Sequence, residues 1–208
     1  MVRRRSFVYG ACVAIAWPAL ALGQTFDPSA DPVFQKALAV NRGLKSYRAR
    51  ISVRTRLVLG GFALHGNVYQ RGGMTKIAFD DVPAIAKSFV ENQPSIGDPA
   101  TWPQKYVMSV AQHDADTTTY HLVPRAASSV RSIDVVLANQ SGLAQRYVWA
   151  NANGVTITSE QQYETLDGFE LVGSSTSATR GPAVKADSVT TFSDYEINVN
   201  IPDSVFSG

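Results

Sequence analysis

The chain has 208 residues, 45% of them hydrophobic and 17% charged, which is enough length and apolar material for one sizeable core. Its net charge of +2 includes three arginines within residues 1–23, where there is no acid, so residues 24–208 carry −1 and nucleic acid is not indicated as a partner. The single cysteine, Cys12, lies in the same N-terminal part, which excludes disulfides and a cysteine metal site from the rest of the chain.

Residues 1–23 have the pattern of a cleaved secretory signal peptide. Arginines at positions 3–5 precede an apolar run over 7–22, and residues 21–23 (Ala-Leu-Gly) place small side chains where a signal peptidase reads. The run is shorter than the roughly 20 residues that a membrane-spanning helix needs. We expect export to the periplasm, by the Sec or the twin-arginine route, and a single domain over residues 24–208. An uncleaved anchor is the alternative.

A helix is predicted directly after Asp31 and Pro32. Asp31 suits the N-cap, Pro32 the first turn and Gly43 the end of the helix. The apolar residues in between recur at helical spacing and predict one buried stripe. They are Val33, Phe34, Ala37, Leu38, Val40 and Leu44.

Residues 47–57 alternate between apolar and polar side chains, which is the period of a half-buried antiparallel strand. The polar positions are Arg48, Arg50, Ser52, Arg54 and Arg56. One interpretation is a solvated wall that resists edge-to-edge aggregation. The other is a site for anionic headgroups or an acidic partner. No aromatic residue shares this face, which argues against base stacking.

The rest of the chain alternates between short strand patterns and turn signals, such as residues 60–61, 72–73 and 151–154. About ten strands in a meander are predicted, so the fold class is mainly β: a curved antiparallel sheet forming an unclosed β-barrel. Residues 81–104 interrupt the strands with a short helical pattern followed by an irregular stretch, residues 94–104, that contains three prolines. A long irregular segment within a β meander predicts a lid or rim.

Recognisable catalytic motifs do not occur. The chain has no GxSxG elbow, no Walker-type loop and no dinucleotide-binding glycine loop. His113 and His121 flank Asp114 and Asp116, but turn aspartates are common for backbone reasons, so this metal signal is weak. We expect no cofactor, no metal and no enzymatic activity; a hydrolase-like enzyme with an unrecognised site is the alternative.

Four short segments, LKSYRARISVR, GNVYQRGGMTKIAFDDVP, YHLVPR and NVNIPDSVF, follow the signal and the helix within an interrupted meander. With these segments, the chain resembles the LolA/LolB-like family of periplasmic lipoprotein carriers over most of residues 30–206. The resemblance implies an unclosed barrel with helices over its mouth and an apolar cavity for acyl chains. It also implies that Arg71, which matches the family's functional arginine, helps to hold the lid shut.

The predicted cavity lining combines the inward positions of the first strands with the lid segment. The candidate ligand-binding residues are Tyr47, Ile51, Val53, Leu57, Phe62, Leu64, Val68, Arg71, Phe79, Ile85, Phe89 and Trp102. The expected function is a carrier that holds a lipid or lipoprotein acyl chain in an apolar cavity. The expected partners are a lipid or acylated protein and a handover protein of the inner or outer membrane, and the expected state is a monomer. The alternative is a periplasmic protein-interaction or sensing domain without lipid cargo.

Overall fold

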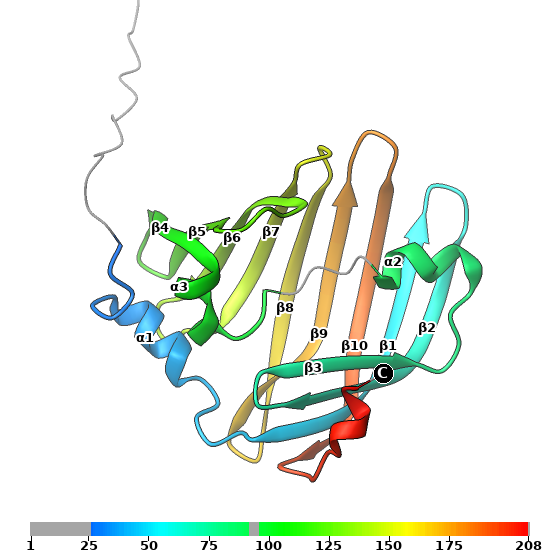
Figure 1. Ribbon diagram of the computed structural model, residues 1–208, viewed down its shortest axis with the longest axis horizontal. Helices are drawn as coiled ribbons and strands as arrows, with labels where there is room; N and C mark the ends of the chain where they lie inside the picture. Colours follow the sequence, from blue (N-terminus) through cyan, green and yellow to red (C-terminus); the bar gives the residue numbers. More distant parts are fainter. Residues whose placement is uncertain (1–25, 92–95, 208) are drawn as a thin grey trace, which may run out of the picture.

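The computed structural model describes residues 26–91 and 96–207, so the predicted signal peptide lies outside the described residues. One antiparallel sheet of ten strands forms the body of the molecule, in the order β3-β2-β1-β10-β9-β8-β7-β6-β5-β4 (Figure 1). The edge strands β3 and β4 do not pair with each other, so the sheet curves without closing. This confirms the predicted fold class and the number of strands.

Strands that follow one another along the chain are neighbours in the sheet, except β3 and β4, which form its two edges and are joined by the lid segment. The one pair of neighbours that is distant in sequence is β1 and β10. The strands are β1 (Ser46–Leu57), β2 (Gly61–Arg71), β3 (Met74–Phe79), β4 (Tyr106–His113), β5 (Thr117–Pro124), β6 (Val130–Ala138), β7 (Ala144–Asn151), β8 (Thr156–Leu166), β9 (Phe169–Arg180) and β10 (Lys185–Ile197). The helices are α1 (Pro32–Ala39), η1 (Ala84–Ala86), α2 (Lys87–Glu91), η2 (Pro99–Thr101), α3 (Trp102–Lys105) and η3 (Asp203–Val205).

Helix α1 starts where the sequence predicts and ends earlier. The Asp31 carboxylate accepts a hydrogen bond from the Phe34 N–H at 2.8 Å, as an N-cap does. The prediction that the helix reaches Gly43 is wrong, because Val40 is already extended and Asn41 has a φ of 58°. The Asn41 side chain instead bonds the backbone N–H and C=O of Glu170, each at 2.7 Å, which draws the chain toward β9.

Strand β1 confirms the predicted alternation. Ala49, Ile51, Val53 and Thr55 are buried, and the four arginines between or beside them are exposed. Residues paired across neighbouring strands share a face, so Val53 places Leu64 of β2 and Thr190 of β10 on the same side. Gly66 is required in β2, because a Cβ there would lie 2.2 Å from the Ala78 carbonyl oxygen of β3.

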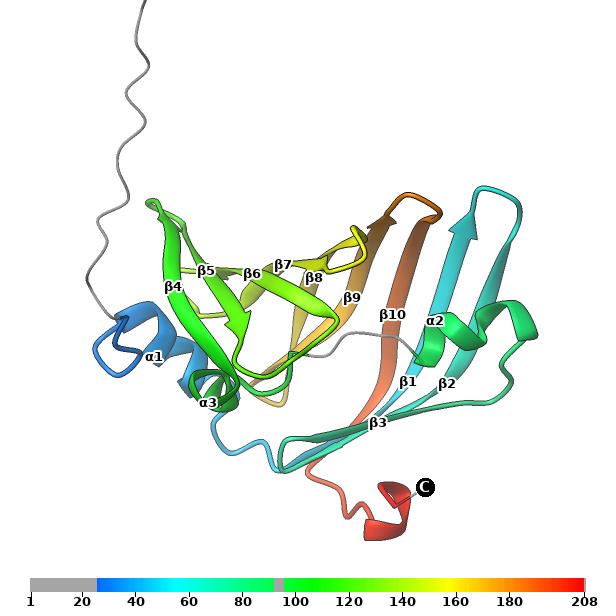
Figure 2. The same ribbon diagram turned by 45° about the horizontal axis from the view of Figure 1, so that its top comes forward.

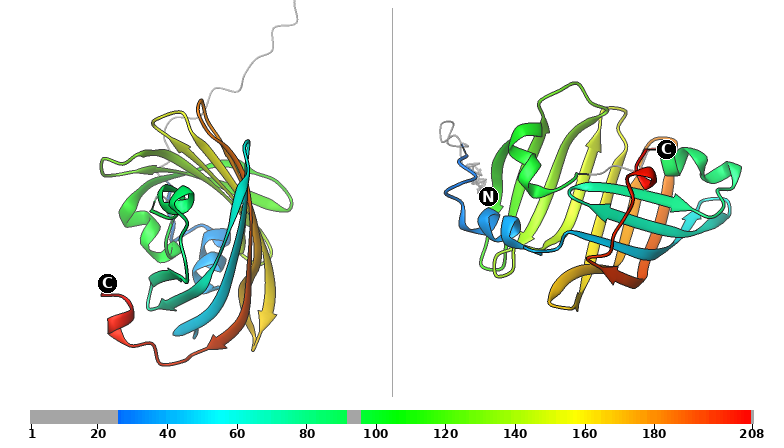
Figure 3. Two further views of the ribbon diagram at one scale, coloured as in Figure 1. Left: turned by 90° about the vertical axis from the view of Figure 1, so that its right-hand side faces the viewer. Right: turned by 60° about the horizontal axis from the view of Figure 1, so that its bottom comes forward.

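The sheet curves around its helices, which lie on one side of it (Figures 2 and 3). We call this side the concave face and the other the outer face. Helices α1 and α3 pack at the β4–β7 end, and α2 packs at the β1–β3 end. The core is therefore divided between two apolar clusters rather than placed in one central layer.

Candidate functional site

The apolar cluster under α2, which we call the lid cluster, unites half of the predicted lining. Its buried members are Ile51, Val53, Leu64 and Ala86. The partly buried side chains packed on them are Phe62, Ile77, Phe79, Val82, Phe89, Val90 and Phe192. The Phe62 and Phe89 rings meet edge to face with centroids 5.5 Å apart, so this aromatic pair joins α2 to β2. The period-two pattern of β1 and β2 was sufficient to predict that Ile51 and Val53 share a face, as do Phe62 and Leu64, whereas Ile77 and Phe192 were not predicted.

Four other predicted lining residues lie outside the lid cluster. Val68 is buried further along β2, and Leu57 is only half-buried at the end of β1. The Tyr47 ring contacts the Tyr195 ring at 5.5 Å between centroids, and burial raises the pKa of Tyr47. Ile85 is 56% exposed. The structure therefore does not place Ile85 beside Phe89 on a buried rim.

Trp102 belongs to the second apolar cluster, which we call the helix cluster. Its side chain is 1% exposed and its ring lies 6.0 Å from the ring of Phe34 of α1. Tyr120 in the same cluster donates a hydrogen bond to Asp31 at 2.6 Å. Burial, and then the Asp31 carboxylate, raise the pKa of Tyr120. The structure separates Trp102 from Ile85 and Phe89, which the sequence analysis assigned to one rim, because residues 97–105 fold back onto α1 and β4.

Arg71 reaches the C-terminal segment. Its guanidinium donates to the Ile201 carbonyl oxygen and to the Asp203 carboxylate, and it lies 5.2 Å from the centre of the Phe206 ring. The guanidinium–ring distance is that of a cation–π contact. Within the described residues, the hydrogen bonds of Arg71 are thus made to residues 201–203 rather than to α2. No sequence pattern near Arg71 signals this, because its partners lie some 130 residues away.

A band of hydroxyl side chains separates the two clusters on the concave face. The register places these residues on the same side as Val53, and the sequence analysis missed them. The Thr55 and Ser188 hydroxyls are 2.9 Å apart, as are those of Ser159 and Ser175. The hydroxyl band consists of Thr55, Ser159, Ser175, Ser177, Ser188 and Thr190. The sequence signal for the hydroxyl band is the run of small polar residues at 174–177 of β9. Only the strand register shows that Ser175 and Ser177 of this run face the concave side.

Two aromatic side chains border the hydroxyl band toward the helix cluster. Tyr147 and Trp149 of β7 stack with ring centroids 5.3 Å apart. Burial raises the pKa of Tyr147 to about 12. The Trp149 indole nitrogen is buried without a hydrogen-bond partner among the described residues. Because Tyr147 pairs with Ser159, polar and aromatic surfaces adjoin here.

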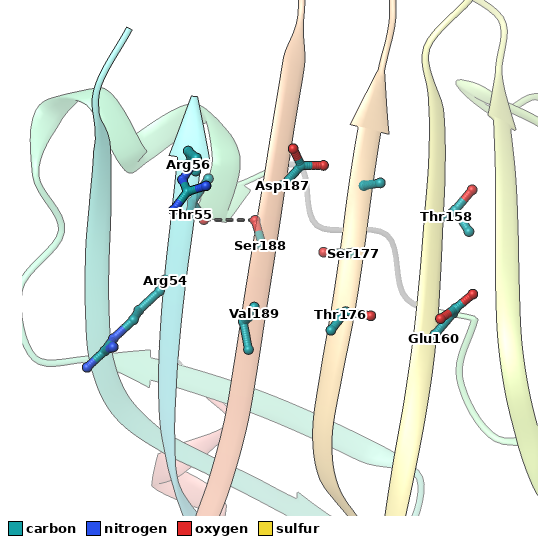
Figure 4. Close-up of a pocket in the computed structure, with 11 residues that line it drawn as sticks. Arg54, Thr55, Arg56, Thr158, Glu160, Thr176, Ser177, Asp187, Ser188 and Val189 are labelled. Carbon is teal, nitrogen blue, oxygen red and sulfur yellow. Dashed lines mark hydrogen bonds between the residues drawn. The ribbon is translucent and has the colours of Figure 1, made fainter. Parts of the chain in front are cut away.

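A separate groove of about 730 Å³ lies on the outer face (Figure 4). Arg54 and Arg56 of β1 form one side, and Glu160 of β8 lies on the other. Val189 and Thr176 lie between them on β10 and β9. The sequence analysis expected a cavity at the apolar side chains of the lid cluster. The groove instead lies on the opposite face of the sheet.

The two histidines of the weak metal signal, His113 and His121, bind different partners in the structure. The His113 imidazole bonds the Thr118 hydroxyl at 2.7 Å, whereas the His121 imidazole bonds the Asp134 carboxylate at 2.6 Å. In residues 26–91 and 96–207, no group of three or more His, Cys, Asp or Glu side chains could hold a metal ion. Nor does this part of the chain contain a helix with the length and apolar character to cross a bilayer.

No protein-family model matches the chain, and no curated protein matches it. Solved structures do share its fold. A LolA superfamily protein from Nitrosomonas europaea matches with a TM-score of 0.59 and 12% identity, over 85% of this chain and 96% of that one. A domain from Vibrio parahaemolyticus, named for outer membrane lipoprotein sorting, matches with a TM-score of 0.65 and 12% identity, over 87% and 97% of the two chains. A DUF1329 family protein from Desulfovibrio piger matches with a TM-score of 0.61 and 12% identity, over 85% and 98%.

The molecule is therefore an unclosed β half-barrel with short helices on its concave face. The three similar structures identify this architecture as a LolA-like fold. At 12% identity the likeness concerns the fold.

Proposed function

We propose that this protein is an exported, periplasmic carrier that binds an acyl chain of a lipid or lipoprotein at the lid cluster. The proposal rests on how that cluster is covered: α2 has only five residues and packs on apolar side chains of β1–β3. A helix this short has little stability of its own, so packing on the cluster must hold it in place. Displacing it would open apolar surface without unfolding the sheet.

Acyl-chain binding needs apolar area and no catalytic group. Each methylene transferred from water contributes about 0.8 kcal/mol, so a sixteen-carbon chain gains roughly 12 kcal/mol before ordering costs. The lid cluster supplies aliphatic and aromatic surface for this contact. The adjacent hydroxyl band supplies donors for the ester or amide oxygens where the chain joins its head group.

The first experiment tests for cargo. Protein recovered after export from a membrane-bearing host is extracted with organic solvent, and the extract is analysed by mass spectrometry. Bound lipid at about one chain per protein is expected. The stripped protein is then titrated with a fluorescent fatty acid. Absence of both extracted lipid and uptake would contradict the carrier function.

The second experiment tests α2 as the cover. Phe89→Ala removes the ring contact with Phe62, which is typically worth about 1 kcal/mol, and should speed release of the fluorescent fatty acid about fivefold to tenfold. Ile85→Ala in the preceding turn is the matched control, because Ile85 is 56% exposed and should leave release unchanged. Equal release from both variants would mean that α2 does not gate the site.

A second candidate function is a periplasmic interaction or sensing domain without lipid cargo. The observation that favours it is the tight packing of the lid cluster, in which Leu64 is 0% and Val53 1% exposed. The apolar side chains of such a closed cluster are already buried by one another, without a ligand. The cargo experiment separates the two functions, because a sensing domain would bind no fatty acid even with α2 weakened by Phe89→Ala.

A further inference from the structure

The topology brings four chain connections to one edge of the sheet. Because all neighbouring strands are antiparallel, the connections after β1, β5, β7 and β9 lie at the same end. They comprise residues 58–60, 125–129, 152–155 and 181–184. In Figure 2 the connections after β1 and β9 both lie at the top of the molecule. We call this the basic edge, for the charges described below.

The β1–β2 turn at this edge exposes two large apolar side chains. Leu59 is 88% and Val58 74% exposed, the highest values for large apolar side chains in the described part of the chain. The Leu57 N–H bonds the Gly60 carbonyl at 2.9 Å, and Gly60 has a φ of 86°, so the turn is tightly closed. A closed hairpin holds Val58 and Leu59 beyond the sheet instead of folding them onto it.

Basic residues recur along the same ends of the strands as this apolar tip. The turns and the strand ends at this edge carry Arg54, Arg56, Lys105, Arg125, Arg131, Arg180 and Lys185. Among the described residues, three acids lie on the same register rows as Arg54 and Arg56. They are Glu160 on the row of Arg54, Asp134 on the row of Arg56, and Asp187, which is the cross-strand neighbour of Arg56 and pairs with Arg180. The opposite edge carries Asp114, Asp116, Glu164, Asp167, Glu170, Asp194, Glu196 and Asp203 together with basic residues. The excess of positive charge is therefore specific to the edge that bears the apolar tip.

Arg54 and Arg56 are the basic residues closest in sequence to the tip. The other two arginines of β1 are paired, Arg48 with Glu196 and Arg50 with Asp80. Among the described residues, Arg54 and Arg56 form no ion pair, and both border the outer groove (Figure 4). Their guanidinium groups therefore have free donors for phosphate oxygens.

We propose that the basic edge docks on an anionic lipid surface. Val58 and Leu59 enter the boundary between headgroups and acyl chains, while Arg54 and Arg56 bind lipid phosphates. Apolar insertion and electrostatic attraction are each weak alone and together give stable peripheral binding. The inference does not depend on the cargo of the lid cluster, and it would hold for a sensing domain as well.

The test uses co-sedimentation of the exported protein with vesicles of phosphatidylcholine alone or mixed with phosphatidylglycerol. Binding to the anionic vesicles, weakened by salt, is expected. Val58→Ser with Leu59→Ser should lower the affinity at least tenfold. Arg54→Gln with Arg56→Gln should lower it about thirtyfold, since a basic residue near such a surface contributes about 1 kcal/mol.

Matched controls come from the opposite ends of the strands and from the two edge strands, β3 and β4. Arg42→Gln with Lys45→Gln removes the same charge from an exposed segment at the opposite edge. Met74→Ser with Val110→Ser removes two exposed apolar side chains. Both control variants should bind anionic vesicles as the unmodified protein does. Parallel circular dichroism spectra verify that every variant is folded.

Three outcomes would overturn the proposal. The unmodified protein could fail to bind phosphatidylglycerol vesicles, or the Val58/Leu59 variant could bind them unchanged. Alternatively, sedimentation analysis could show that the tip joins two copies of the chain, with self-association lost in that variant and vesicle binding kept. Loss of binding in the tip and arginine variants, but not in the controls, supports it.

Discussion

The four arginines of β1 are identical in residue type and differ in environment. Arg48 and Arg50 form ion pairs with carboxylates from β10 and from the end of β3, whereas Arg54 and Arg56 form none among the described residues. The cross-strand neighbour of Arg56, Asp187, is paired with Arg180 instead. Exposed pairs of this kind contribute little to stability. The difference therefore matters for ligand binding more than for stability. Arg48 and Arg50 are neutralised within the molecule, whereas Arg54 and Arg56 border the outer groove.

Buried aliphatic residues of the lid cluster should dominate its stability. Leu64→Ala should lower the free energy of unfolding by about 2–5 kcal/mol, because the removed atoms leave a cavity in a site that is 0% exposed. Leu59→Ala makes the same chemical change at the 88% exposed tip and should alter it by less than about 0.5 kcal/mol. Urea denaturation of both variants checks this; similar losses would mean that the lid cluster is loosely packed.

At the scale of elements, the C-terminal segment is held by one side chain of β2. Arg71 combines a carbonyl hydrogen bond, an ion pair and a ring contact with residues 201–206. The resemblance implied a role for this arginine at the lid. In the described part of the chain, Arg71 instead binds the C-terminal segment that contains η3, at the end of the sheet where β2 turns into β3.

Arg71→Leu should release the C-terminal segment and leave the sheet folded. Asp203 is 90% exposed, so the ion pair itself contributes little, and the expected local loss of about 1–2 kcal/mol comes from the carbonyl bond and the ring contact. Amide hydrogen exchange should rise at residues 201–206. Arg48→Leu, which removes an exposed ion pair from the same sheet, is the control and should leave their exchange unchanged. Faster exchange throughout the sheet would instead assign Arg71 a global role.

The molecule as a whole consists of one sheet with two apolar clusters and a polar band between them. Helix α2 packs only on the lid cluster, whereas α1 and α3 pack in the helix cluster. The hydroxyl band interrupts the apolar contact between the two ends. Opening one end therefore need not disturb the other.

Cargo binding should act on one end of the sheet. With a fatty acid bound, amide exchange in α2 should change, because an acyl chain in the lid cluster must move Phe89 away from Phe62. Exchange around Tyr120 of the helix cluster should stay the same, since its contacts with Asp31 and α1 are separate. Exchange measured with and without the fatty acid decides this. A uniform change across both clusters would show that the sheet responds as one unit.

The sequence by itself determined the ten-stranded meander, the start of α1, the interruption after β3 and the exposed arginine face of β1. These features depend on local patterns. A period of two predicts a strand, an Asp-Pro pair predicts a helix start and Gly-rich pairs predict turns, and each of these patterns spans only a few residues. Only the tertiary structure decided that Trp102 and Phe89 belong to different clusters, that Arg71 binds residues 201–206 and that serines line the centre of the concave face. Those facts depend on strand register and on contacts between residues that are distant in sequence, such as Phe34 with Trp102 and Arg71 with Ile201, which no local pattern encodes.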